Sequence, residues 1–219
     1  MSVKISVSGE QLLFFDRHGY LELEGVFTSQ VITELRENVE NILHTRAQSA
    51  GVVFDDALSL CGHNLALASQ NIQKRLCSPS MGKLVNMMTK MRPLRYGFDQ
   101  VVVPSYPPKG ATLEEVSSIY PVLIGGVIAL DGAERAEEPQ VDPFVFKDLP
   151  ASAGSVSFVK PETVWEVEPS SQRHLLVVFC GAQPLYVHQE RNPYTHVFKE
   201  YGYVFGDRLL DKTNPVVFL

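Results

Sequence analysis

The sequence predicts an α+β protein in which an N-terminal helical layer packs against a jelly-roll of short strands. Two observations lead to this prediction. Residues 1–92 carry apolar side chains at helical spacing, and residues 93–219 carry short runs of β-branched and aromatic residues separated by Gly and Pro turns. We therefore expect one domain over 1–219, with 1–92 as a mainly helical buttress and 93–219 as the jelly-roll core.

The N-terminal layer begins with a strand and a long helix. Residues 19–25 alternate apolar and acidic side chains, which is the period of a half-buried strand. Thr28 or Ser29 can then cap a helix, because either side chain can accept a hydrogen bond from the first helical turn. Helical spacing predicts that one face of this helix carries Ile32, Leu35, Val39 and Ile42.

Further helices are expected over 63–91, divided at Ser78-Pro79-Ser80. Pro79 suits the first position of a helix, where its missing N–H would have no partner in any case. After Pro93 the pattern changes to strands. We expect these over 97–103, 122–130, 154–160, 163–168, 174–180 and 184–188.

Composition and charge exclude several classes of protein. A content of 45% hydrophobic and 20% charged residues is typical of a chain that folds by itself. The formal net charge of −6 disfavours nucleic acid as a partner. The first residues resemble no signal peptide and no apolar run reaches membrane-spanning length, so we expect a cytoplasmic protein without membrane contact. The odd cysteine count, with no CxxC pair, predicts reduced thiols.

Five segments together resemble a known family. Phe14-Phe-Asp-Arg-His-Gly-Tyr-Leu21 and Gly25-Val-Phe-Thr-Ser29 precede the first long helix, and Pro121 to Asp131, Gly154 to Lys160 and Arg173 to Phe179 follow in order. This order is similar to the phytanoyl-CoA-dioxygenase-like branch of the Fe(II)/2-oxoglutarate-dependent oxygenases. The resemblance implies a double-stranded β-helix, or cupin-like barrel, that binds a small molecule, with 2-oxoglutarate as cosubstrate and Fe(II) held by a His-x-Asp pair and a distal histidine.

The chain lacks histidines at the positions that match this triad. The segment 101–118, where the resemblance places His-x-Asp, contains only Glu114 and Glu115 as acids, and Glu162 or Thr163 stands at the place of the distal histidine. No metal site is therefore predicted by motif, and we do not expect Fe(II) to be held by a standard triad. A relocated site would draw on Glu162, His174, His188 or His196, whose spacing matches no zinc motif.

Arg173 corresponds to the arginine that pairs with 2-oxoglutarate in the family. Its planar fork suits a carboxylate, so Arg173 is the candidate carboxylate anchor and Thr163 a secondary candidate for the same site. Alternation places Arg173 on the face of Leu175, Val177 and Phe179, which we expect to be the barrel interior. An arginine on that face requires a partner, and without a bound carboxylate we expect Glu162 or Glu166 to supply it. Cys180 lacks a neighbouring base and is not expected to act as a nucleophile.

Four functions remain open from the sequence. The first is a degenerate oxygenase-fold protein that binds a small molecule without standard iron chemistry. The second is an active oxygenase with atypical metal ligands. The third is a DNA-binding regulator that responds to a divalent cation, which the negative charge and the absence of a basic recognition helix disfavour. The fourth is a structural interaction module. The sequence does not determine the oligomeric state.

Overall fold

A computed structural model describes residues 6–132, 141–168 and 170–219. Residues 1–5, which contributed to the expected location of the protein, lie outside these ranges. In the described part no helix is long and apolar enough to cross a membrane. All three cysteines, Cys61, Cys77 and Cys180, are free thiols, as the sequence predicts.

The N-terminal part is mainly helical, as the sequence predicts. Helix α1 (Gly9–His18) leads into strand β1 (Tyr20–Leu23), and Thr28 then caps the long helix α2 (Ser29–Ala50). Of the face predicted for α2, Ile32, Leu35 and Val39 are buried, whereas Leu43 is buried in place of Ile42. The chain continues through shorter helices, α3 (Phe54–Cys61), α4 (Leu65–Ala68), α5 (Gln70–Leu76) and α6 (Pro79–Thr89).

The strands of the described residues form two antiparallel-rich sheets. The larger sheet has the order β1-β6-β4-β8-β2-β9, and the smaller has the order β3-β7-β5. The added strands are β2 (Leu94–Val101), β3 (Ala111–Thr112), β4 (Ile119–Ala129), β5 (Val145–Phe146), β6 (Val156–Val159), β7 (Val164–Trp165), β8 (His174–Tyr186) and β9 (Val216–Phe218). A single turn of helix, α7 (Leu113–Val116), joins β3 to β4, and a 3-10 helix spans Val197–Tyr201.

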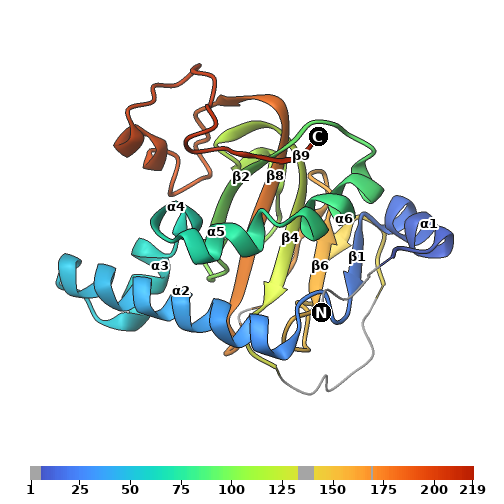
Figure 1. The fold of residues 1–219 in the computed structure, drawn as a ribbon, viewed down its shortest axis with the longest axis horizontal. Helices are drawn as coiled ribbons and strands as arrows, with labels where there is room; N and C mark the ends of the chain where they lie inside the picture. The colour runs from blue at the N-terminus through green and yellow to red at the C-terminus, as the bar shows by residue number, and fades with distance from the viewer. Residues whose placement is uncertain (1–5, 133–140, 169) are drawn as a thin grey trace.

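The helices cover one face of the large sheet. Figure 1 shows α2 running across the lower part of this sheet, with α4, α5 and α6 above it. Two side-chain contacts join the helices to this face. The Asp99 carboxylate of β2 accepts from the first backbone N–H groups of α4, and Arg173, just before β8, forms an ion pair with Glu40 of α2. Asp99 lies opposite Val177 in the pairing of β2 with β8, so the odd-numbered residues of β8 around Val177 face the helices.

The opposite face of the large sheet looks toward the small sheet. A Cβ on Gly125 would touch the side chains of Leu113, from α7, and Leu176, from β8. Tyr20 of β1 lies on the same side, since its ring is 5.7 Å from the ring of Phe146 in β5. Both faces are therefore buried, and Leu175, Leu176, Val177 and Val178 are all fully excluded from solvent.

Candidate functional site

The segment that the resemblance assigns to the first two metal ligands is occupied by a helix cap. Thr112 and Glu115 form a capping box at the start of α7, in which the Glu115 carboxylate accepts from the Thr112 backbone N–H at 2.9 Å. Glu115 also pairs with Arg191, 3.1 Å away, and Glu114 is exposed. The two glutamates thus belong to a helix start, which is the role expected of acids at that position.

The two residues considered for the distal ligand differ in their surroundings. Glu162 is exposed. Thr163 is fully buried, and its hydroxyl donates to the carbonyl of Gly19 at 3.0 Å, just before β1. Gly19 has a φ of +79°, and a Cβ there would lie 2.4 Å from the Thr163 hydroxyl. Thr163 therefore closes the turn between α1 and β1, and its hydroxyl has a structural partner.

Trp165 is the residue of this region that sequence reasoning missed. It lies two residues beyond Thr163 in β7, is fully buried, and packs edge-to-face on Phe146 with ring centroids 5.0 Å apart. Its ring nitrogen Nε1 is buried and has no hydrogen-bond partner among the described residues. The available signal was composition, because Trp165 is the only tryptophan in 219 residues and a buried indole N–H ordinarily has a partner.

Arg173 lies on the helix-facing side of the sheet, so the predicted interior position is wrong. Its guanidinium pairs with Glu40 of α2 and with Asp131, to whose Oδ2 the Nε–H donates at 2.9 Å. These acids replace the expected partners Glu162 and Glu166. The pairing holds the pKa of Asp131 below its usual range, against the effect of burial.

The error has a physical cause. Alternation shows that Arg173 shares a face with Leu175, Val177 and Phe179, but it identifies the interior only where one face of a sheet is solvated. Here both faces are buried, so the hydrophobic pattern of β8 does not distinguish them. The role of Arg173 as a carboxylate anchor stays a prediction.

The histidines considered for a relocated metal do not converge. His174 is buried on the inner side, where its ring nitrogens contact the carbonyls of Pro150 at 2.9 Å and Gln172 at 3.2 Å, and burial lowers its pKa. His188 and His196 lie together beyond β8, with ring centroids 6.0 Å apart, and both pack on Phe205. Among the described residues, no group of three or more His, Cys, Asp or Glu could hold a metal ion.

Cys180 is buried in β8 next to the carbonyls of Arg95 and Tyr96. Burial raises the pKa of its thiol to about 12. Because the thiolate is the nucleophilic form, this environment agrees with the expectation that Cys180 is not a nucleophile.

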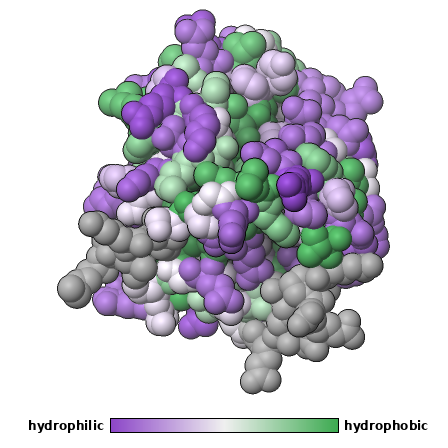
Figure 2. All heavy atoms as spheres, turned by 90° about the vertical axis from the view of Figure 1, so that its right-hand side faces the viewer, coloured by the Kyte–Doolittle hydropathy of each residue, from purple (hydrophilic) through white to green (hydrophobic). Residues whose placement is uncertain are grey.

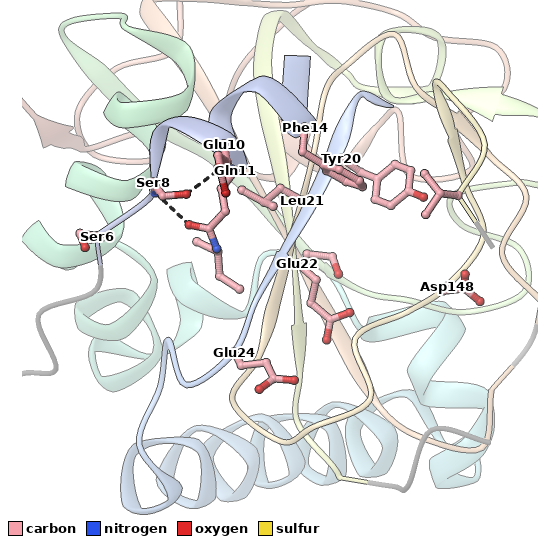
Figure 3. A pocket seen from close by; sticks show the side chains of 13 residues that line it. Ser6, Ser8, Glu10, Gln11, Phe14, Tyr20, Leu21, Glu22, Glu24 and Asp148 are labelled. Atoms are coloured by element: carbon pink, nitrogen blue, oxygen red, sulfur yellow. Dashed lines mark hydrogen bonds between the residues drawn. The ribbon is translucent and has the colours of Figure 1, made fainter. Parts of the chain in front are cut away.

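A pocket of about 870 Å³ opens at the β1 edge of the large sheet. Figure 3 shows Glu22 on β1, Glu24 just after β1 and Asp148 on another segment of the chain, while Phe14 and Tyr20 form an aromatic corner. Glu10 adds a fourth acid, and the described residues that line the pocket include no Lys, Arg or His. Burial, and next the charge of Asp148, raise the pKa of the Tyr20 hydroxyl, as expected in a negative potential.

Comparison with solved structures identifies the fold. SnoK, a non-heme α-ketoglutarate-dependent carbocyclase from nogalamycin biosynthesis, matches with a TM-score of 0.69 and 16% identity, over 96% of each chain. This chain has the fold of the non-heme α-ketoglutarate-dependent enzymes. The epimerase SnoN of nogalamycin biosynthesis matches with a TM-score of 0.63 and 13% identity, over 95% of this chain and 97% of SnoN. CytC3, solved with Fe(II) and α-ketoglutarate, matches with a TM-score of 0.55 and 14% identity, over 82% of this chain and 79% of CytC3.

At these identities the likeness to α-ketoglutarate-dependent enzymes concerns the fold alone. No protein-family model matches the sequence, and no curated protein matches it. The iron that this fold holds in CytC3 therefore has to be tested against the residues of this chain. The capping box at Glu115, the partnered hydroxyl of Thr163 and the buried indole of Trp165 do not form a donor set for Fe(II), which prefers imidazole and carboxylate.

Proposed function

We propose that this chain uses the oxygenase fold to bind a small organic cation in the acidic pocket at the β1 edge, without a standard His-x-Asp and His iron centre. The observation that carries the proposal is the lining of that pocket, which combines four carboxylates with two aromatic rings and no basic side chain among its described residues. Its volume of about 870 Å³ lies within the range of small-molecule sites.

The chemistry of the pocket selects the ligand class. Carboxylates attract a positive charge, and the faces of Phe14 and Tyr20 can add a cation–π contribution of roughly 0.5–1 kcal/mol at a partly exposed site. Among the described lining residues, an anion would meet like charge from Glu10, Glu24 and Asp148. An ammonium group attached to an apolar body satisfies both kinds of lining. SnoN, which shares the fold, was solved with α-ketoglutarate and a nogalamycin compound, so the fold accommodates small molecules elsewhere.

The proposal includes the finer architecture of the strands. Successive strands from β2 to β8 alternate between the large and the small sheet, which is the winding expected of a double-stranded β-helix or jelly-roll. The phytanoyl-CoA-dioxygenase-like branch, the single domain and the cytoplasmic location stay predictions.

The interaction-module alternative requires a large apolar surface. Figure 2, which faces the side that carries α1, shows hydrophilic side chains interleaved with smaller hydrophobic patches. This face therefore gives no support to the alternative, whereas the pocket at the β1 edge supports ligand binding.

Calorimetry with phenethylammonium and its uncharged analogue phenethyl alcohol tests the proposal. We expect the ammonium to bind and the alcohol to bind at least several-fold more weakly, with the difference decreasing as salt is added. Glu24→Gln should lower the ammonium affinity by roughly twofold to fivefold, the effect of one exposed charge. Glu37→Gln, an exposed change on α2, is the matched control and should leave the affinity unchanged.

Two results would overturn the proposal. Equal binding of the alcohol, or an equal effect of Glu24→Gln and Glu37→Gln, would remove the cation site. Iron-dependent conversion of 2-oxoglutarate to succinate by the purified protein would establish the alternative of an active oxygenase with atypical ligands.

A further inference from the structure

The acidic pocket is elongated, because it follows β1 at the edge of the large sheet. Its described lining includes every residue from Tyr20 to Glu24. A strand advances by about 3.3 Å per residue, so the ends of this stretch lie roughly 13 Å apart. Figure 3 shows Tyr20 at one end and Glu24 at the other, with Glu22 between them. A single ammonium group therefore reaches only one end of the pocket.

Asp148 gives the Tyr20 end its negative charge. After burial, the charges of Asp148 and Asp142 are the next causes of the raised pKa of the Tyr20 hydroxyl, so both carboxylates lie near this ring. Asp142 forms an ion pair with Lys147, whereas Asp148 is exposed and forms none with the described residues. Phe14 packs edge-to-face on Tyr20, with ring centroids 6.0 Å apart. An ammonium group at this end would meet a carboxylate that no described cation neutralises, beside an aromatic surface.

Glu24 gives the opposite end a second carboxylate. It directly follows β1, is exposed, and forms no ion pair with the described residues. Tyr20 and Glu24 are an even number of residues apart along an extended chain, so their side chains lie on the same face. One extended ligand on this face can contact both ends of the pocket.

The pocket is larger than a compact monocation fills. Its volume of about 870 Å³ lies in the upper part of the range for small-molecule sites. Phenethylammonium, whose ring and ammonium group lie close together, would occupy only part of it. The described lining also includes the apolar side chains of Leu21, Leu23 and Val141, against which a hydrocarbon chain can lie. A ligand with a hydrocarbon middle and two charged ends matches the whole pocket.

We propose that the ligand of the acidic pocket is an elongated dication, a diamine or polyamine whose ammonium groups are joined by a hydrocarbon chain. One ammonium group pairs with Asp148 beside the rings of Phe14 and Tyr20, and the other pairs with Glu24. This inference rests on the proposed function, since it names the ligand class of the same pocket. Binding at one end makes the contact at the other end intramolecular, which strengthens the binding of a dication over that of a monocation.

Calorimetry on the intact protein with octamethylenediamine, octylamine and ethylenediamine tests the proposal. The first amine carries two charges on a long chain, the second has the same chain with one charge, and the third has two charges close together. We expect octamethylenediamine to bind roughly threefold to fivefold more tightly than either of the others, the effect of one additional exposed charge pair. This advantage should decrease as salt is added.

Two variants assign the advantage to the two ends of the pocket. Asp148→Asn and Glu24→Gln should each bring the affinity of octamethylenediamine close to that of octylamine, because either change leaves one charged end. Glu37→Gln, an exposed change on α2, is the matched control and should keep the full advantage of the diamine. Circular dichroism checks that each variant is folded.

The outcomes separate this inference from the proposed function. Equal affinities of octamethylenediamine and octylamine in the parent protein would overturn the elongated dication, whereas continued binding of phenethylammonium would leave the cation site in place. Equal affinities of octamethylenediamine and ethylenediamine would place both charges at one end and would also overturn the inference. An unchanged advantage in folded Asp148→Asn or Glu24→Gln would overturn the role of that end. If none of these amines binds, nor phenethylammonium, both proposals are wrong.

Discussion

Asp99, in the large sheet, and Trp165, in the small sheet, are both fully buried residues with polar groups, and they differ in how completely the protein supplies hydrogen-bond partners. The Asp99 carboxylate accepts from the backbone N–H groups of Leu65 at 2.7 Å and Ala66 at 2.8 Å, and from the Tyr96 hydroxyl at 2.6 Å. The Trp165 indole has no partner among the described residues. Both carboxylate oxygens of Asp99 thus have donors within the protein, whereas the Trp165 donor has no acceptor among the described residues.

The difference separates a buried polar group that has a complete structural role from one that has no partner among the described residues. Helix α4 begins at Asn64, whose own side chain makes no capping bond and whose φ is +49°. Asp99 supplies the missing acceptors from β2 and so fixes the helix to the sheet, which is a complete structural explanation. The described residues supply no such acceptor to the Trp165 indole.

Replacement of Asp99 should produce the largest loss of stability. A small loss would contradict the structural role given to Asp99 above. Asp99→Ala leaves two buried backbone N–H groups at the start of α4 without acceptors, so we expect a loss of about 3–5 kcal/mol in the free energy of unfolding. Urea denaturation measures this loss. Asp211→Ala, at an exposed carboxylate, is the control and should change the free energy by less than about 1 kcal/mol.

The pH dependence of stability should come next in size. Burial, and next the charge of Arg46, lower the pKa of His63 to about 4. The folded state binds this proton less tightly than the unfolded state, whose pKa is near 6.5. The stabilisation is therefore complete above pH 6.5 and is lost as the pH falls toward 4, by at most about 3 kcal/mol.

Denaturation of the parent protein and of His63→Gln at a series of pH values isolates this contribution. We expect the stability of the parent to fall more steeply between pH 6.5 and 4 than that of the variant. Parallel curves would mean that His63 is charged in the folded protein, and its buried Nδ1, which has no described partner, would then need a new acceptor.

Arg173→Ala should have an intermediate effect and distinguishes two roles for that residue. Its pairs with Glu40 and Asp131 are about 30% and 21–30% exposed, so we expect a loss of about 1–2 kcal/mol, less than for a fully buried pair. Because its donors are already engaged, 2-oxoglutarate should not raise the melting temperature of the parent. A rise that disappears in Arg173→Ala would instead support the predicted carboxylate anchor.

Much of this architecture can be predicted from local sequence, whereas the hydrogen-bond partners of the candidate site residues cannot. The Thr28 cap, the division of the helices at Pro79 and the strand at Tyr20 to Leu23 depend on neighbouring residues, so the sequence predicted them. The two-residue strands β3 and β5 carry too little pattern to predict. The partners of Arg173 and the unpaired state of Trp165 depend on residues tens of positions away, which no local pattern encodes.

Trp165→Phe should have the smallest effect on the folded protein and would sharpen the comparison most. Phenylalanine keeps most of the contact with Phe146 and removes the unpaired N–H, so the lost packing and the relieved burial cost oppose each other. We expect a change in the free energy of unfolding of less than about 1 kcal/mol, measured by urea denaturation. Phe146→Leu controls for altered packing against the same ring. A destabilisation by Trp165→Phe as large as that by Asp99→Ala would mean that the indole N–H is held by an internal partner, and the contrast between Asp99 and Trp165 would then disappear.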